Sequence, residues 1–125
     1  MLPDTLPQEY RDNIATLTNA LLSTSNSNLI QKIYLFGSCA RGIIHHHSDI
    51  DLAVILSEEP TIDLRLNIRV DAVTKLDADK APVFEYDLKF GTENSLAQPT
   101  EYSVFSRIKR EGVIIYDTSK HLATE

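Results

Sequence analysis

The sequence predicts an α/β or α+β fold, with a small mixed sheet flanked by helices. Segments in which apolar residues recur at helical spacing alternate along the chain with short apolar runs of strand length. Clusters of Gly, Pro, Asn, Asp and Ser separate these segments and mark the turns. The chain has 125 residues, enough for one core, so we expect a single domain over 1–125. A sheet that buries its apolar side under helices is a stable arrangement for this pattern.

Two long helices are predicted from apolar stripes at helical spacing. The first is expected to begin near Pro7, which suits a first helical turn, and to fade in the polar stretch 23–28. Its stripe contains Tyr10, Ile14, Leu17 and Leu21. The other long helix is expected over roughly 61–77. Its stripe contains Ile62, Leu66, Val70, Val73 and Leu76.

The remaining elements are shorter. Strands are expected over 29–36, 49–56, 83–90 and 113–116. A short helix over 38–41 follows the first strand, and Gly42 can end it. The stretch 91–99 is expected to be a loop, and a last helix over about 100–111 is stopped by Gly112.

Charge and cysteine content exclude some classes of protein. The chain carries 18 acidic and 12 basic residues, a net charge of −6. Polymerases and tRNA-tailing enzymes neutralise phosphates with a basic face, so a nucleic-acid partner is not expected. One cysteine cannot form an intrachain disulfide, which suits a reducing interior. The N-terminal residues show no signal-peptide pattern and no apolar run is long enough for a membrane span, so we expect a cytoplasmic location.

Two acidic residues begin the second predicted strand. Asp49 and Asp51 project from one face of that strand, while Ile50, Leu52 and Val54 project from the other. Two carboxylates on one face, with no lysine or arginine between them, repel each other unless a cation lies there. Carboxylate oxygens suit magnesium, which usually takes one or two of them together with the phosphates of a nucleotide.

The Gly37-Ser38 turn at the end of the first strand provides the other half of such a site. Ten residues, 39 to 48, separate it from Asp49. Glycine lets the backbone approach a phosphate closely, and the first N–H groups of the following helix are free to bind it. The sequence therefore predicts a site for a metal ion and a nucleotide.

These residues carry a family resemblance. GSCARG followed by SDIDL resembles the GS-x10-D-x-D signature of the DNA polymerase β-like nucleotidyltransferase superfamily. Within it, the chain resembles the minimal nucleotidyltransferase (MNT) proteins, many of which are antitoxins paired with a HEPN-domain toxin. IKREGVIIYD near the C-terminus is similar to the close of that domain, so the resemblance covers most of the chain. It implies the polymerase β-like nucleotidyltransferase fold.

The third predicted strand carries two further acidic residues. Phe84, Tyr86, Leu88 and Phe90 share its apolar face, and Val83, Glu85, Asp87 and Lys89 share the other. The resemblance implies a third carboxylate here, which by motif position is Asp87, with Glu85 as the reserve candidate. Asp49, Asp51 and Asp87 would then be the catalytic residues and hold two magnesium ions. The plain alternative is that these acids form the solvated face of an antiparallel sheet.

Other residues near the motif leave alternatives open. Ser38 is a candidate for binding the β- and γ-phosphates or a simple N-cap. Arg41 matches the family's ARG segment, where it either helps to neutralise the triphosphate or packs structurally. Cys39 departs from relatives that carry a basic residue at this position, and packing is favoured over thiol chemistry. His45, His46 and His47 cannot all face one metal from a regular segment, so an exposed loop is expected, although they could contact the nucleotide or the acceptor.

The resemblance implies an enzyme that uses magnesium and a nucleoside triphosphate, with ATP as the expected substrate. It would transfer AMP to a hydroxyl, with release of pyrophosphate, and the expected acceptor belongs to a partner protein, a HEPN toxin. One alternative is an antitoxin that acts by binding alone, with a dormant site. The other is a nucleotidyltransferase that modifies a small molecule of the aminoglycoside type.

Overall fold

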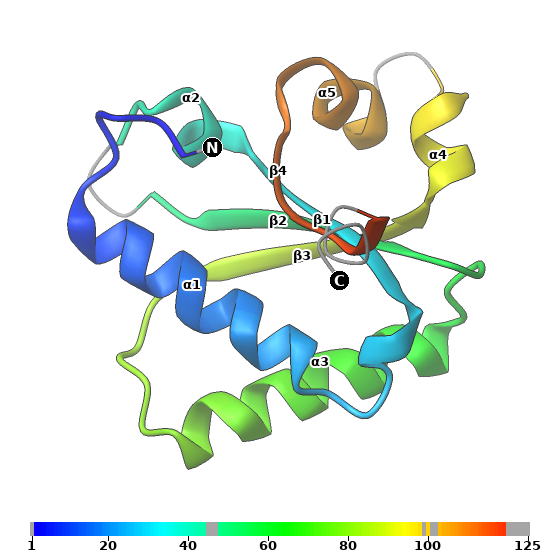
Figure 1. Cartoon of the computed structure of the whole chain (residues 1–125), viewed down its shortest axis with the longest axis horizontal. Helices are drawn as coiled ribbons and strands as arrows, with labels where there is room; N and C mark the ends of the chain where they lie inside the picture. Colours follow the sequence, from blue (N-terminus) through cyan, green and yellow to red (C-terminus); the bar gives the residue numbers. More distant parts are fainter. Residues whose placement is uncertain (1, 45–47, 99, 101–102, 120–125) are drawn as a thin grey trace.

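The computed structural model describes residues 2–44, 48–98, 100 and 103–119. The chain forms a four-stranded sheet with helices packed on both of its faces (Figure 1). The elements in order are α1 (Gln8–Leu22), the 3-10 turn η1 (Ser27–Leu29), β1 (Ile30–Phe36), α2 (Gly37–Arg41), β2 (Ile50–Leu56), α3 (Ile62–Ala78), β3 (Tyr86–Thr92), α4 (Glu93–Ala97), α5 (Val104–Glu111) and β4 (Val113–Asp117). Among these described helices, none is long and apolar enough to cross a membrane.

The strand order is β3-β2-β1-β4. Strand β1 pairs with β2 and with β4 in antiparallel fashion, whereas β2 and β3 run parallel. Two parallel neighbours need a crossover connection, and α3 supplies it. The predicted class, a mixed sheet flanked by helices, is confirmed.

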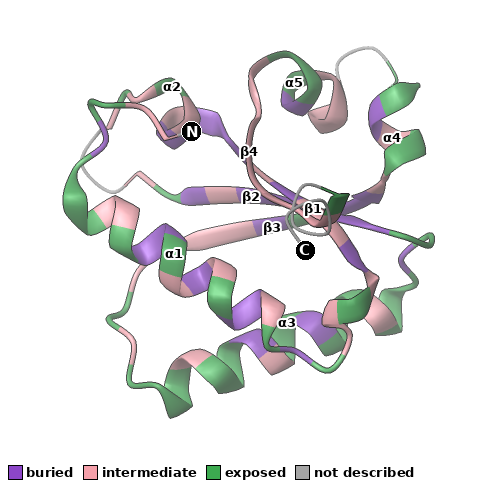
Figure 2. Cartoon of the chain, viewed as in Figure 1, coloured by how far each residue is buried: buried purple, intermediate pink, exposed green. Residues whose placement is uncertain are grey.

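Apolar side chains pack on both faces of the sheet. The larger cluster lies under α1 and α3 and contains Ile50, Leu52 and Val54 of β2, as the alternation predicted. The smaller cluster lies under α4 and α5 and contains the intervening β2 residues Ala53 and Ile55. Figure 2 shows this burial along the central strands. Because both faces are covered, only the ends of the strands are available for chemistry.

Helix α1 buries the stripe that the sequence predicted. Ile14, Leu17 and Leu21 are buried, and Tyr10 packs partly buried against the same cluster. The helix begins at Gln8 after Pro7 and ends at Leu22, close to the predicted limits.

The stripe predicted for α3 is wrong at all of its residues except Leu76. Ile62, Leu66, Val70 and Val73 are 80%, 55%, 53% and 44% exposed. The buried side is formed by Ile68 and Ala72, with Leu64 and Leu76 partly buried beside them. The exposed and the buried apolar residues of α3 both recur at helical spacing. Periodicity alone therefore does not show which of the two sets faces the core.

Polar contacts outside the stripe accompany the rotation of α3. The Arg69 guanidinium donates to the carbonyl of Leu88 on β3 at 3.0 Å and lies over the Phe90 ring at 5.0 Å. Asp71 accepts a hydrogen bond of 2.8 Å from the Ser25 hydroxyl, beyond the end of α1. These polar contacts are compatible with the rotation that buries Ile68 and Ala72.

Several predicted element ends also need correction. Strand β3 starts at Tyr86, not at 83, and Val83 is fully exposed. The expected loop 91–99 contains α4, because the Thr92 and Ser95 side chains form a capping box that starts a helix. Gly91 belongs to β3, and a Cβ there would lie 2.5 Å from the Phe105 ring. Helix α5 starts at Val104, later than expected, since the Ser103 side chain caps it.

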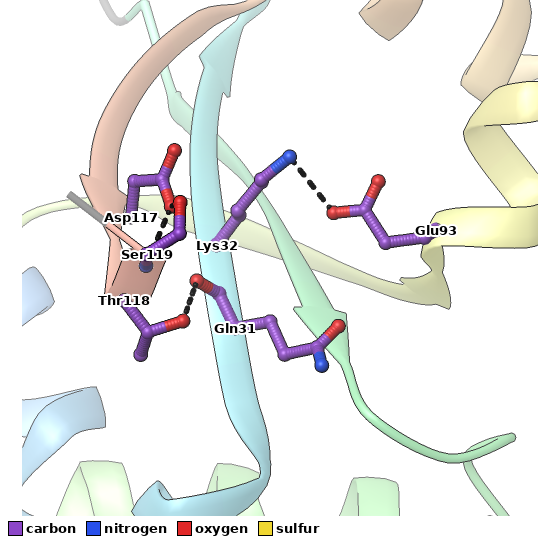
Figure 3. Close-up of polar contacts among 6 residues, drawn as sticks. All are labelled: Gln31, Lys32, Glu93, Asp117, Thr118 and Ser119. Atoms are coloured by element: carbon purple, nitrogen blue, oxygen red, sulfur yellow. Dashed lines mark hydrogen bonds and ion pairs between the residues drawn. The ribbon is translucent and has the colours of Figure 1, made fainter. Parts of the chain in front are cut away.

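Polar contacts join neighbouring elements at the end of the sheet where β1 begins. Lys32 of β1 pairs with Glu93 of α4 at 3.0 Å, and the Thr118 hydroxyl donates to the Gln31 carbonyl at 3.0 Å (Figure 3). Asp117 accepts a hydrogen bond from the Ser119 hydroxyl at 2.6 Å. These contacts lie away from Gly37 and Asp51, which sit at the other end of β1 and its partner β2.

Candidate active site

The three predicted aspartates come together at one end of the sheet. Asp51 of β2 and Asp87 of β3 are register partners in the parallel pair. Asp49 immediately precedes β2. Burial raises the pKa of the Asp51 carboxyl, and the negative charges of Asp87 and Asp49 raise it further. The parallel pairing therefore gathers acidic groups from separate parts of the chain.

Glu85, the reserve candidate, lies just before β3 and is exposed. Its carbonyl accepts a hydrogen bond of 3.1 Å from the N–H of Ile50. It is not among the charges that shift the pKa of Asp51. Of the two acids, Asp87 is the one placed beside Asp51.

Gly37 brings the turn after β1 against the carboxylate of Asp51. The backbone there has φ +75°, a left-handed conformation that favours glycine. A Cβ at this position would lie 2.4 Å from Oδ2 of Asp51. The two halves of the predicted motif, Gly-Ser and Asp-x-Asp, are thus in direct proximity.

The N-cap interpretation of Ser38 is wrong. Helix α2 begins at Gly37 with Phe36 as its N-cap, so Ser38 is already inside the helix. The strand ends at Phe36 as predicted, and the left-handed conformation of Gly37 starts the helix one residue earlier than expected. Gly42 ends α2 in a left-handed conformation with φ +72°, as predicted.

Cys39 lies beneath the site and is fully buried. Burial raises the pKa of its thiol to about 11, and the negative charge of Asp51 adds to this effect. The thiol contacts the carbonyl of Asp49 at 3.5 Å. A protonated, enclosed thiol agrees with the packing role and leaves no thiolate for chemistry.

Basic side chains accompany the acids. Lys89 pairs with Asp87, with 3.1 Å between Nζ and Oδ2. Arg107 of α5 lies over the Phe36 ring at 5.9 Å, and its positive charge lowers the pKa of Asp51 against the larger raising effects. The sequence predicts that Lys89 lies on the same strand face as Asp87, but it does not predict the ion pair between them. No local pattern indicated Arg107, because its position depends on how α5 packs on the sheet.

Arg41 forms an ion pair with Glu111 at 3.0 Å. This contact joins α2 to the end of α5, which is the structural alternative considered for Arg41. His45, His46 and His47 lie outside the described residues, so their predicted position is untested.

The residue types at this end of the sheet fit a divalent cation. The carboxylates supply hard oxygen donors, and their mutual repulsion is relieved by positive charge. As the described side chains stand, no group of three or more His, Cys, Asp or Glu is arranged to hold a metal ion. Asp87 is turned to Lys89 instead. Binding an ion with all three aspartates would require their side chains to move, and Lys89 engages one of the two carboxylate oxygens of Asp87.

Comparison with known proteins defines the class. The family described as "Polymerase beta, Nucleotidyltransferase" matches residues 19–121, most of the chain. This protein therefore belongs to the polymerase beta nucleotidyltransferase family, and the predicted membership is confirmed. None of the curated proteins matches the chain.

Several solved structures are similar to this chain. One similar chain comes from a crystal structure of "the toxin-antitoxin with AMP-PNP", with 25% identity and a TM-score of 0.57, over 87% of this chain and 77% of that one. Two others come from mutants of the toxin-antitoxin MntA-HpeT. One, with two Asp-to-Glu changes, is 21% identical with a TM-score of 0.52, over 89% and 75% of the chains. The other, with a Tyr-to-Ala change, is 22% identical with a TM-score of 0.52, over 89% and 75%. The latter two show a shared fold.

Proposed function

We propose that this nucleotidyltransferase is an antitoxin that transfers AMP from ATP to a hydroxyl of a partner protein, a HEPN-type toxin. The observation that carries the proposal is the pairing of Asp51 with Asp87, with the Gly37 turn against Asp51. The partner is suggested by the similar chain from a toxin-antitoxin structure with AMP-PNP.

Each part of the site has a separate task in this proposal. The backbone at Gly37 and Ser38 binds the triphosphate, where a side chain at Gly37 would collide with Asp51. Lys89 and Arg107 supply positive charge next to the acids. Arg41 stays a candidate for the phosphates, provided that it leaves Glu111. The acceptor oxygen bonds to the α-phosphorus, the bond to the pyrophosphate breaks, and pyrophosphate and a proton are released.

Magnesium belongs to this proposal as the partner of the acids. Asp49, Asp51 and Asp87 would hold it, in the two-ion arrangement that the family resemblance implies. When bound, magnesium offsets phosphate charge and lowers the pKa of an attacking hydroxyl.

Incubation with ATP, Mg²⁺ and a HEPN-type protein, if the neighbouring gene encodes one, tests the proposal. Intact-protein mass spectrometry should show the toxin heavier by one or more AMP units. Asp51→Asn should abolish the gain, while Asp63→Asn, the same change at an exposed position of α3, should preserve it.

The alternatives predict different outcomes. An unmodified toxin that is nevertheless inhibited in a stable complex would indicate an antitoxin that acts by binding alone. The pairing of Asp87 with Lys89 is the observation that favours this second candidate. Transfer to small hydroxylated amines without any protein partner would identify a small-molecule nucleotidyltransferase.

A further inference from the structure

A pocket of about 430 Å³ opens next to the acidic end of β2, between α1 and the segment that leads into β3. Its walls include Glu9, Tyr10, Asn13, Ile50, Phe84 and Glu85. The residues on either side of Asp49 both contribute to the lining. The Ile50 N–H donates to the Glu85 carbonyl at 3.1 Å, which joins the two strand ends that form this wall. A molecule in the pocket would therefore lie beside the candidate active site.

Asn13 is a buried polar residue in the pocket wall. Only 8% of its surface is exposed, and its carboxamide forms no hydrogen bond with any described residue. Buried amide groups are nearly always hydrogen-bonded, because leaving them unpaired is costly. Within the described part of the chain, no side-chain nitrogen or oxygen that is sealed from solvent lacks a partner, so the Asn13 amide retains access to the pocket. It is available to a ligand.

The described walls of the pocket are negatively charged. Glu9 and Glu85 carry carboxylates that pair with no basic group among the described residues, and the described lining contains no Lys, Arg or His. Tyr10 donates from its hydroxyl to the Ser48 carbonyl at 3.2 Å. Its pKa is raised chiefly by burial, and the negative charges of Glu9 and Asp49 contribute. An anionic ligand is disfavoured here, and a cationic one is favoured.

The remaining walls are apolar or aromatic. Ile50 is buried, and Phe84 packs partly buried at the entrance to β3. Such surfaces accommodate the methylene stem of a long side chain, while aromatic rings attract a cation through their faces. The combination suits arginine or lysine: an apolar stem, and a head that donates hydrogen bonds to Asn13 and is balanced by the carboxylates.

We propose that this pocket binds a cationic side chain, arginine or lysine, of the protein acceptor and so positions the neighbouring hydroxyl at the aspartates. The role of the pocket in acceptor binding rests on the proposed function, whereas the binding of a cation does not. The pocket would make the enzyme select hydroxyls that have a basic residue nearby.

Binding can be measured without nucleotide or metal. Acetyl-arginine amide is titrated into ¹⁵N-labelled protein, and the Asn13 side-chain amide and the Ile50 N–H are followed by NMR. Acetyl-citrulline amide, which has nearly the same shape without the charge, is the matched ligand. We expect saturable shifts at both positions with arginine and at least about fivefold weaker binding of citrulline.

Variants test which residues are responsible. Asn13→Leu removes the buried carboxamide at similar volume, so the fold should be retained while arginine binding weakens about tenfold. Glu9→Gln should weaken it about two- to fivefold. Glu58→Gln, the same change in the turn at the far end of β2, should have no effect. Equal binding of citrulline and arginine, or an effect of Glu58→Gln as large as that of Glu9→Gln, would overturn the proposal.

The source of the cation is tested in the same assay. Displacement of acetyl-arginine amide by an aminoglycoside at much lower concentration would assign the pocket to a small molecule and overturn a protein acceptor. The transfer reaction gives an independent readout. If arginine binds as expected but no AMP is transferred, the proposed function fails and the pocket stands. If tyrosine peptides with arginine and with citrulline are modified with equal KM, the pocket proposal fails and the proposed function stands.

Discussion

The first residues of strand β2 differ in burial and in charge according to the face from which they project. Ile50 and Leu52 are 1% and 0% exposed and pack in the larger apolar cluster. Asp51, between them, points to the other side, where burial and two further carboxylates raise its pKa. One face lowers the free energy of the folded chain by removing apolar surface from water. The other face begins at Asp51 with like charges that the fold tolerates, before Ala53 and Ile55 return to apolar packing, and the proposed chemistry depends on that acidic start.

The largest expected effect is the fall in the rate of AMP transfer in the variant Asp51→Asn. This change keeps the side-chain shape and removes one negative charge from the site. The rate of AMP transfer should fall by at least about 10²–10³-fold, since charge that develops in the transition state loses its partner. Single-turnover assays with labelled ATP measure it. Full transfer by the variant would remove Asp51 from the catalytic assignment and leave no functional difference between the faces.

Leu52→Ala should lower the stability of the fold and leave the rate of transfer nearly unchanged. Leu52 is fully buried, so its truncation should lower the free energy of unfolding by about 2–5 kcal/mol. Urea denaturation measures this loss. Transfer per folded molecule should be nearly unchanged at a temperature where the variant is folded. A loss of transfer without a loss of stability would contradict the division between the two faces.

Magnesium and ATP should stabilise only a protein with an intact acidic face. A ligand that binds the folded state at 100 times its Kd adds about 2.7 kcal/mol of stability. Thermal melts of the wild type should therefore shift upward with Mg-ATP, and chelator should reverse the shift. Asp51→Asn should show little of this stabilisation. An equal shift in chelator would argue against a metal-dependent nucleotide site.

Without ligand, Asp51→Asn should stabilise the fold by about 0.5–1 kcal/mol at neutral pH. The folded-state pKa of Asp51 is raised, so its ionisation opposes folding and stability is lost as pH rises through that pKa. Below the ordinary aspartate pKa, the carboxyl is protonated in both states and the penalty is absent. The gap between variant and wild type should thus grow from acidic to neutral pH in urea melts. A variant that is less stable at every pH would mean a structural role for Asp51.

Leu66→Gln should have the smallest effect on stability. It is the exposed-leucine control for Leu52→Ala. Leu66 is 55% exposed on α3, and leucine and glutamine have similar helix propensities. We expect a change within about 0.5 kcal/mol in the free energy of unfolding. A loss comparable to that of Leu52→Ala would show that the outer stripe of α3 is buried in solution.

The sequence alone predicted the features that depend on residues close to one another along the chain. Alternation separated Asp51 from Ile50 and Leu52, and the positions of Gly37 and Gly42 predicted the turns around α2. The rotation of α3 was not predictable in this way, because Leu66 and Ile68 belong to two equally periodic stripes. In the folded chain Ile68 and Ala72 face the core, and a hydrogen bond from Arg69 to the Leu88 carbonyl, on a strand distant in sequence, accompanies this rotation. Pairings such as Lys89 with Asp87 likewise depend on side-chain positions in the folded chain.

The buried thiol of Cys39 has a practical consequence. It is the chain's one cysteine, it is fully enclosed, and its pKa is raised to about 11. An alkylating reagent can modify it only while α2 is transiently detached from the sheet. The rate of alkylation under native conditions therefore reports the opening equilibrium of the segment that follows Gly37. Slower labelling in the presence of a nucleotide would measure how strongly that nucleotide holds the segment closed, without any assay of transfer.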